Sequence, residues 1–488
     1  MKSPDRIGPA TVASPAPAND WLDRPDPITR RALLKAMAGA AGAVALGSIA
    51  AACGTASTPS APAASGAASA AAASPSPTKS GPVKLVLMTD PNEFKTEELN
   101  PFLTAHPNIK VEFIKNDLAR FQAMVAAGNP PDVFRVQAAG IPQYIARKLL
   151  LDLQPYFEAS KLLPPADLAP ANDSYKWDGT KIGQGHLYGM VKDWSPDYTI
   201  FAYTKAFADA GVAVPGDGEP LTYQAVYELG KKVNKKNGNK RVYWGFAHSN
   251  AYDWIDRTAM NMLAEKDQSL YAPDFTSINL TGNPEARSVF EFLFRLAKEG
   301  LDQNPADPSP AWVGADFTNG LVAMVQYGYW FSAMAESDKT KGKVVMLPAP
   351  TWAGVRRDPT MTATGWVVSS HTKEPDAAWE LFQWYMGDEP AKTRATSGWG
   401  VPGLISLYGR MPRVGPFQTQ VQKVLEGELD HSRFVLQYNP YLSEQAAAAA
   451  YKKHIETALK GQIGFDEMLS RIESDVNQAI QDGKERIG

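Results

Sequence analysis

Cysteine and histidine are scarce in this chain of 488 residues. Cys53 is the only cysteine, so an intramolecular disulfide cannot form and a cysteine-based structural zinc site is excluded. No two of the six histidines lie within four residues of each other, so the paired-histidine zinc motif is absent as well. The net charge of −3 gives no excess of positive charge that could bind the phosphates of a nucleic acid. We therefore expect no nucleic-acid partner.

Sequence motifs of common enzymes are also missing. The chain contains neither a Gly-x-Ser-x-Gly elbow nor a Walker phosphate loop. The glycine-rich run 183–189 has the wrong spacing for a dinucleotide fingerprint and is more typical of a turn that leads into a strand. We therefore expect no cofactor, no metal and no catalytic residue. A carboxylate pair for glycoside hydrolysis stays open, because a chain with 52 acidic residues always offers some pair.

The N-terminal region has the pattern of an export signal. Arg30 and Arg31 stand just before an Ala/Gly-rich apolar run at 36–52, which is too short for a comfortable membrane span. The paired arginines resemble the twin-arginine signal, and the small residues before Cys53 resemble the bacterial lipoprotein cleavage box. We predict that residues 1–52 are a lipoprotein-type export signal and that Cys53 carries the lipid.

The segment after Cys53 is built almost entirely of Ala, Ser, Pro, Thr and Gly. Such a composition buries too little apolar surface to offset the entropy lost on ordering. We predict a disordered, lipid-anchored linker at 53–82, which tethers a folded body to the outer face of the cell membrane.

From Val83 onward, short apolar runs alternate with helical patterns. This alternation favours an α/β fold with parallel, doubly wound sheets. The expected strands are 83–88, 109–114 and 132–136. The expected helices are 93–105, 118–127, 141–151, 222–234, 285–298, 375–386 and 466–481, with Thr222 as a helix cap.

Several aromatic residues lie outside the apolar helical stripes, in polar stretches that contain Gly or Pro. Flat aromatic faces stack on the C–H faces of sugar rings, so a set of such positions indicates a carbohydrate site. The alternative for any single ring is packing in the core. The clearest stretches contain Trp194 to Tyr198, Tyr252 to Trp254, Tyr329-Trp330, Gly365-Trp366 and Trp399.

The order of motifs from Val83 to about Gln481 resembles the carbohydrate-binding branch of the extracellular solute-binding proteins that serve ABC importers, a branch that includes maltose-binding protein. The segments that carry the resemblance are the opening strand and helix at 83–102, Ala126 to Val133, Leu149 to Tyr156, Tyr188 to Met190, Phe201 to Phe207, Ala210 to Val212, Phe317 to Met324 with Trp330, Leu347 to Pro350, and Ala377 to Leu381.

The resemblance implies a type II periplasmic-binding-protein fold, in which hinge segments join two α/β lobes. We expect an N-lobe at 83–198 and 365–412, and a C-lobe at 199–364 and 413–488. The chain would then cross between lobes near Asp197-Tyr198 and near Gly365-Trp366, two of the aromatic stretches found from composition.

The resemblance also implies a binding role without catalysis: capture of a sugar and delivery to a membrane permease, by a protein that we expect to be a monomer. In the family that the chain resembles, Trp330 matches a position that stacks on the ligand, and Asp197 matches a polar ligand contact near the hinge. Asp90 and Gln137 come directly after expected strands, and open α/β sheets bind ligands at the carboxyl ends of their strands. The full predicted binding set is Asp90, Gln137, Trp194, Asp197, Tyr198, Tyr252, Trp254, Trp330, Gly365, Trp366, Trp399 and Tyr441. A non-sugar solute such as a phosphodiester, polyamine or peptide, and an exported carbohydrate-active enzyme, are the alternatives.

Overall fold

The structure is a computed structural model that describes residues 81–248, 251–308 and 311–487. The predicted export signal at 1–52, Cys53 and the predicted linker as far as residue 80 lie outside the described residues. The folded body begins at Gly81.

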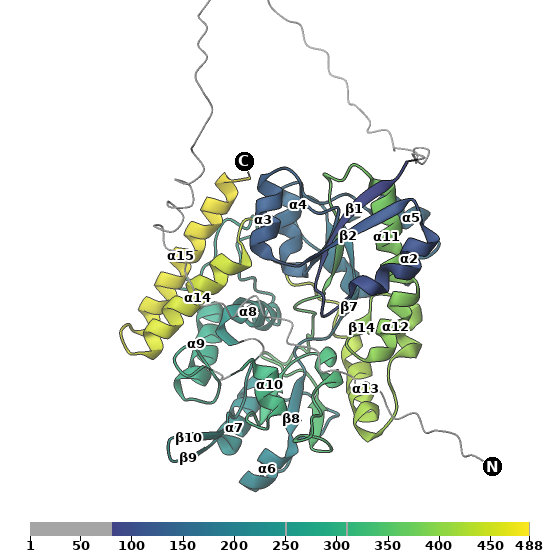
Figure 1. The fold of residues 1–488 in the computed structure, drawn as a ribbon. Helices are drawn as coiled ribbons and strands as arrows, with labels where there is room; N and C mark the ends of the chain where they lie inside the picture. Colours follow the sequence, from purple (N-terminus) through teal and green to yellow (C-terminus); the bar gives the residue numbers. More distant parts are fainter. Residues whose placement is uncertain (1–80, 249–250, 309–310, 488) are drawn as a thin grey trace, which may run out of the picture. The chain divides into compact units, whose positions relative to one another are not determined.

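The first sheet has the strand order β2-β1-β3-β13-β6 (Figure 1). Its strands are β1 (Val83–Thr89), β2 (Ile109–Lys115), β3 (Val133–Val136), β6 (Gly189–Val191) and β13 (Gly365–Val368). β1 pairs in parallel with β2 and β3, whereas β13 runs antiparallel to β3 and β6. The predicted parallel arrangement is therefore confirmed for three strands, and the sheet as a whole is mixed.

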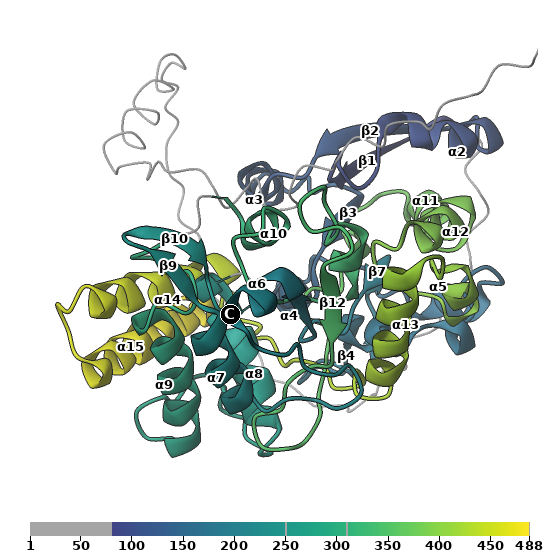
Figure 2. The ribbon, with the colours of Figure 1, turned by 90° about the horizontal axis from the view of Figure 1, so that it is seen from below.

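Helices and short ribbons surround the first sheet, and we call this set with its sheet the N-lobe. α11 packs on β1 and β13, and it lies beside α12 in both views (Figures 1 and 2). The helices are η1 (Thr96–Leu99), α2 (Asn100–Ala105), α3 (Leu118–Ala126), η2 (Ala138–Gly140), α4 (Ile141–Ala146), α5 (Gln154–Ala159), η3 (Pro165–Asp167), η4 (Pro170–Tyr175), α11 (Pro375–Gly387), α12 (Glu389–Ser397) and η7 (Ile405–Arg410). The small strands are β4 (Lys176–Trp177), β5 (His186–Leu187), β7 (Asp193–Trp194) and β14 (Val401–Pro402).

The second sheet has the order β11-β8-β12, and both neighbours run antiparallel to β8. Its strands are β8 (Ile200–Tyr203), β11 (Met324–Gln326) and β12 (Val344–Leu347). Every residue of β8 is buried, as expected for the central strand of a sheet that is covered on both faces. A separate antiparallel pair consists of β9 (Lys235–Asn237) and β10 (Lys240–Tyr243).

Helices also cover the second sheet, and together they form what we call the C-lobe. α14 and α15 lie side by side in both views and pack against each other (Figures 1 and 2). The helices are α6 (Thr204–Ala210), α7 (Tyr223–Val233), η5 (Ala251–Trp254), α8 (Ile255–Ala264), α9 (Pro284–Lys298), α10 (Val313–Thr318), η6 (Tyr329–Ala333), α13 (Pro416–Leu429), α14 (Glu444–Leu459) and α15 (Phe465–Glu485).

Local sequence patterns predicted many of these elements well. The structure confirms the helices expected at 222–234, 285–298 and 375–386, and the Thr222 side chain accepts a hydrogen bond from the Ala225 N–H at 3.1 Å. The cap is favourable because it satisfies an N–H that has no partner within the helix.

One predicted helix is wrong in length. The helix expected at 141–151 ends at Ala146, and Lys148 adopts a left-handed φ of 57°. The Leu151 N–H then donates to the Val368 carbonyl at 2.9 Å, so the chain after Lys148 runs beside β13. A long-range pairing has replaced the last turns of the expected helix.

The main chain crosses between the two sheets more than once. Residues 195–199 join β7 of the N-lobe to β8 of the C-lobe, and the segment after β12 returns through 358–364 to β13. A further crossing lies between η7 and α13. Each lobe is therefore built from separate parts of the chain, and the first two crossing segments are hydrogen-bonded to each other.

Candidate functional site

Polar side chains follow two neighbouring parallel strands of the N-lobe. Asp90 comes directly after β1 and Gln137 directly after β3, and both are half-buried. Carboxyl ends of parallel strands meet at one edge of a sheet, where open α/β sheets bind ligands. The predicted placement of these two residues at strand ends agrees with the structure.

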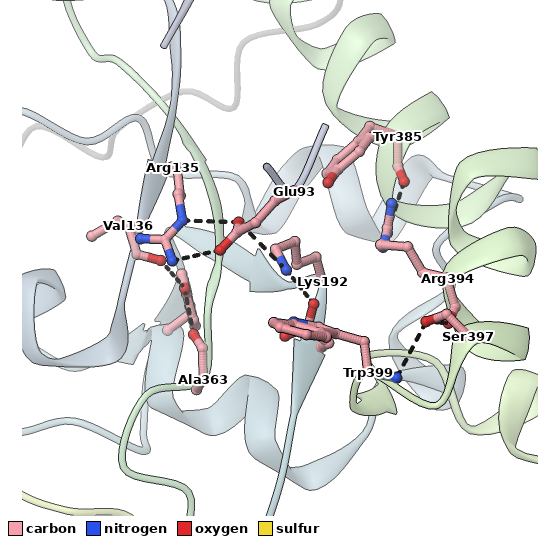
Figure 3. A network of polar contacts seen from close by, with 11 residues as sticks. Glu93, Arg135, Val136, Lys192, Ala363, Tyr385, Arg394, Ser397 and Trp399 are labelled. Carbon is pink, nitrogen blue, oxygen red and sulfur yellow. Dashed lines mark hydrogen bonds and ion pairs between the residues drawn. The ribbon is translucent and has the colours of Figure 1, made fainter. Parts of the chain in front are cut away.

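A group of four charged side chains lies near this edge, and we call it the ionic cluster: Glu93, Arg135, Lys192 and Asp193. Glu93 lies between the two cations (Figure 3). It accepts two hydrogen bonds from Arg135, at 2.9 Å from Nε and 2.7 Å from Nη2, and its Oε2 lies 3.5 Å from Lys192 Nζ. Lys192 also pairs with the carboxylate of Asp193.

The ionic cluster is buried and internally neutralised. The side chains of Arg135 and Glu93 are 8% and 9% exposed, and that of Lys192 is 2% exposed. Burial alone would raise the pKa of Glu93, but Arg135 and Lys192 outweigh that effect and lower the pKa to about 2. Burial would lower the pKa of Lys192, yet Asp193 and Glu93 raise it. Glu93 therefore stays ionised between two cations, Arg135 and Lys192, at neutral pH.

Three half-buried indoles form a second feature, which we call the aromatic cluster: Trp312, Trp330 and Trp399. The ring centroids of Trp330 and Trp399 are 5.9 Å apart, and Trp312 lies 6.3 Å from Trp330 with its ring plane tilted by only 22°. Trp330 belongs to η6 of the C-lobe, and Trp399 follows α12 of the N-lobe. The aromatic cluster therefore joins the two lobes.

Trp399 connects the aromatic cluster to the ionic cluster. Its ring points toward Lys192 in Figure 3. Trp399, Lys192 and Asp193 together line a small hollow. The backbone N–H of Trp330 donates to Ser195 Oγ at 2.9 Å, which fixes η6 against the first crossing segment. Indole faces and buried charges thus come together where the chain passes from one lobe to the other.

The structure corrects the prediction that Trp366 and Trp194 are ligand-binding residues. Trp366 is fully buried inside the N-lobe, and its ring stacks on Tyr385 with centroids 3.6 Å apart. Trp194 is also buried, and its Nε1–H donates to the Pro402 carbonyl at 3.2 Å. Neither indole offers a free face, because core packing already covers it.

Tyr198 and Tyr252 are likewise core residues, against the prediction. The Tyr198 hydroxyl donates to the Arg257 carbonyl at 2.7 Å, and the Tyr252 hydroxyl donates to the Leu293 carbonyl at 3.0 Å. Both rings are buried in the C-lobe. A buried tyrosine needs a partner for its hydroxyl, and a backbone carbonyl supplies one in each case.

Asp197 and Gly365 belong to the backbone of the crossings. Asp197 is buried and its Oδ2 accepts the Met361 N–H at 2.7 Å, so its carboxylate holds the second crossing segment. Gly365 lies in β13, where an added Cβ would come within 1.9 Å of the Met190 carbonyl oxygen. The contacts of both residues are structural: Asp197 binds the backbone of the second crossing segment, and Gly365 lets β13 approach β6 closely.

Trp254 and Tyr441 line other hollows. Trp254 is buried, with the Arg257 guanidinium 3.7 Å from its ring centre, and it lines a small hollow together with Tyr438. Tyr441 lines a larger groove between α3, α4 and α15. The predicted binding residues are therefore dispersed, and the aromatic cluster contains only Trp330 and Trp399 of them.

Five residues of the two clusters were missed from the sequence, although a signal existed for most of them. The missed residues are Glu93, Arg135, Lys192, Asp193 and Trp312. Arg135 interrupts the apolar run of β3, and Lys192-Asp193 interrupt the buried stretch from β6 to β7. A charge inside a strand that is otherwise buried requires a partner, so each interruption points to a paired site.

Residues 81–487, apart from the two internal gaps, contain no group of three or more His, Cys, Asp or Glu side chains that could hold a metal ion. None of the helices in the same part of the chain combines the length and apolar character that crossing a membrane requires.

Comparison with known proteins identifies the family. Residues 88–392 match the family described as bacterial extracellular solute-binding protein. The chain belongs to this family. Solute-binding proteins of this kind are defined by binding and not by catalysis, and the N-lobe and C-lobe of this solute-binding protein correspond to the family's two-lobed type II fold.

Relatives with related folds come from several bacteria. The lactose-binding protein of Rhizobium radiobacter is 24% identical over 302 residues, which is 59% of this chain and 67% of the relative. The substrate-binding protein Lmo0181 of Listeria monocytogenes, in complex with cycloalternan, has a TM-score of 0.67 at 21% identity, over 82% of this chain and 99% of that one. The sugar-binding protein MalE of Xanthomonas citri has a TM-score of 0.63 at 16% identity, over 83% of this chain and 99% of that one.

Proposed function

We propose that this solute-binding protein captures a sugar or oligosaccharide and delivers it to the permease of an ABC importer. The observation that carries the proposal is the approach of Trp330 and Trp399, one indole from each lobe, to 5.9 Å beside the ionic cluster. The relatives named above bind sugars according to their descriptions, which supports the same ligand class here.

The chemistry of the two clusters suits a neutral, hydroxyl-rich ligand. Indole faces stack on the C–H faces of a sugar ring, and a few polar groups fix its orientation. In the ionic cluster, Arg135 and Lys192 supply donors, whereas Glu93 and Asp193 supply acceptors. Because the charges of the cluster cancel, it favours neither an anionic nor a cationic solute. Phosphodiesters and polyamines are therefore less suitable ligands than sugars.

Further parts of the proposal concern the location and working form of the protein. We propose lobes at 83–198 with 365–412 and at 199–364 with 413–488, joined by hinges that let the lobes close over the sugar. The proposal also includes export through a twin-arginine signal at 1–52, a lipid anchor on Cys53 with a linker at 53–82, and a monomeric protein. Family membership supports export, and the lipid anchor rests on the sequence pattern around Cys53.

A titration of the purified protein with mono- and oligosaccharides tests the ligand class, with intrinsic tryptophan fluorescence and melting temperature as readouts. A sugar at a hundredfold excess over its dissociation constant adds about 2.7 kcal/mol of stability. A shift in melting temperature with at least one sugar is expected. If no sugar changes the fluorescence or the melting temperature, but spermidine or a phosphodiester does, the ligand is a non-sugar solute and the proposal is wrong. Release of reducing ends from a polysaccharide would instead indicate an enzyme.

Substitution of the aromatic cluster tests the site itself. We expect Trp330→Ala or Trp399→Ala to weaken sugar binding about tenfold or more, since loss of one stacked ring removes at least about 1.4 kcal/mol. Trp177→Ala is the matched control, because Trp177 is another half-buried indole but lies in β4 outside both clusters. Unchanged affinity in both cluster variants would mean that the sugar binds elsewhere.

A further inference from the structure

The indole of Trp312 packs directly on the backbone of α10. Trp312 stands just before Val313, the first residue of that helix. A Cβ atom built on Gly314 would lie 2.2 Å from both Cζ3 and Cη2 of the Trp312 ring. Real atoms cannot approach so closely, so the ring occupies the space that any larger residue at 314 would need. The position of the Trp312 indole therefore depends on glycine at 314.

Two buried rings contact both Trp312 and Trp330. Tyr327 is 1% exposed, and its ring centroid lies 6.0 Å from Trp312 and 5.1 Å from Trp330. Phe331 is 0% exposed, and its ring centroid lies 6.2 Å from Trp312 and 5.6 Å from Trp330. The two indoles therefore share one buried support, and their planes differ by only 22°. Rings that are held in this way lose little conformational entropy when a ligand binds.

The three indoles of the aromatic cluster form a series with Trp330 in the middle. The ring centroid of Trp330 lies 6.3 Å from that of Trp312 and 5.9 Å from that of Trp399. Among the described residues, no ring contact joins Trp312 to Trp399 directly. An indole face stacks on the C–H face of one sugar ring, so three indoles in series offer more stacking surface than a single sugar ring can cover.

We propose that Trp312 stacks on a second sugar ring and that Gly314 is the residue that positions it, so that the ligand is an oligosaccharide of two or more rings. The inference rests on the proposed function, because it takes the aromatic cluster as the sugar site. A sugar ring at Trp330 and Trp399 leaves Trp312 for the neighbouring ring. Loss of Trp312 should therefore weaken the binding of a disaccharide more than that of a monosaccharide.

Calorimetric titration of the full chain with matched pairs of sugars tests this difference. The pairs are glucose with maltose, mannose with mannobiose, and galactose with lactose. For the pair that binds, we expect the disaccharide to bind about tenfold more tightly than its monosaccharide, because one more ring is stacked. Trp312→Ala and Gly314→Ala should each remove most of this preference and change the affinity for the monosaccharide by less than about threefold.

A double-mutant cycle shows whether Gly314 acts through Trp312. An added methyl group at 314 displaces the end of a side chain, which rotates more easily than backbone moves, so the fold is expected to survive. Gly314→Ala should then have no further effect in a chain that already carries Trp312→Ala, because the displaced ring is absent. Gly427→Ala is the matched control: Gly427 is an exposed helical glycine of α13, and an added Cβ meets only Arg356 Nη2, at 3.7 Å.

Equal affinity for a disaccharide and its monosaccharide would overturn the inference. It would also be overturned if the effects of Gly314→Ala and Trp312→Ala added in full. If Gly314→Ala does not fold, Trp312→Ala decides the question, with Trp177→Ala as its control. A protein that binds none of these sugars contradicts the proposed function together with this inference, whereas sugar binding without a preference for the disaccharide contradicts this inference alone.

Discussion

Glu93 shows how a single carboxylate can organise a buried site. It contacts Arg135 of β3 and Lys192, which lies between β6 and β7. Moving charges out of water is costly, and the cost is met here only because opposite charges face each other at hydrogen-bond distance. The same pairing holds donors and acceptors in place beside Trp399, so a ligand would meet groups that are already oriented.

Replacement of Glu93 is expected to destabilise the protein strongly. Glu93→Gln leaves two buried cations with only the carboxylate of Asp193, and loss of one partner from a buried pair costs about 3–5 kcal/mol. Urea denaturation measures this loss. Because the pKa of Glu93 is lowered to about 2, its contribution is complete above about pH 4.5 and disappears as the pH falls toward 2.

The loss of unfolding free energy caused by Glu93→Gln should therefore become smaller as the pH falls from about 4.5 toward 2. Glu97→Gln, at an exposed position on η1, is the control and should change stability by less than about 0.5 kcal/mol. A deficit for Glu93→Gln that stays constant from pH 5 to pH 2.5 would show that the charge of Glu93 is not what stabilises the cluster.

The elements show where local pattern and long-range pairing differ. The helices with strong apolar stripes appear where their sequences predict them, because burial of one face stabilises a helix in any fold. The stretch after Ala146 does not follow its pattern, because Leu151 finds a partner in β13, which is far away in the sequence. The close pairing of β13 with β6 depends in turn on the absence of a side chain at Gly365.

Gly365→Ala is expected to disrupt the first sheet. The new methyl group would lie 1.9 Å from the Met190 carbonyl oxygen, so β13 and β6 would have to separate. The loss should exceed about 4 kcal/mol, and thermal unfolding measures it. Gly409→Ala is the matched control in the same lobe, since an added Cβ there meets nothing within 4 Å. A melting temperature for Gly365→Ala equal to that of the control would contradict this account of the pairing.

On the scale of the whole molecule, the proposed function depends on movement of the two lobes about the crossings. A sugar that binds the closed arrangement better shifts the population toward it, by no more than the difference in its affinity for the two arrangements. The reciprocal bonds of Asp197 and Asp358 hold the two crossing segments to each other.

Small-angle X-ray scattering tests the closure. A saturating sugar is expected to lower the radius of gyration of the unsubstituted protein, because the lobes approach each other around it. Trp399→Ala at the same sugar concentration should keep the larger radius of gyration, because the variant lacks the stacking contact that stabilises the closed arrangement. An unchanged radius in a protein that demonstrably binds sugar would mean that binding does not require closure.

The amino-acid sequence by itself determined the alternation of strands and helices and the family. These features depend on local periodicity and on the order of motifs, which can be read along the chain. Tertiary structure alone decided which aromatic residues face the proposed site. Trp366 and Trp399 have similar neighbours in sequence, yet Trp366 stacks on Tyr385 in the core and Trp399 lies beside Lys192. The exposed face of a ring is set by partners that are distant in sequence, and no local pattern encodes them.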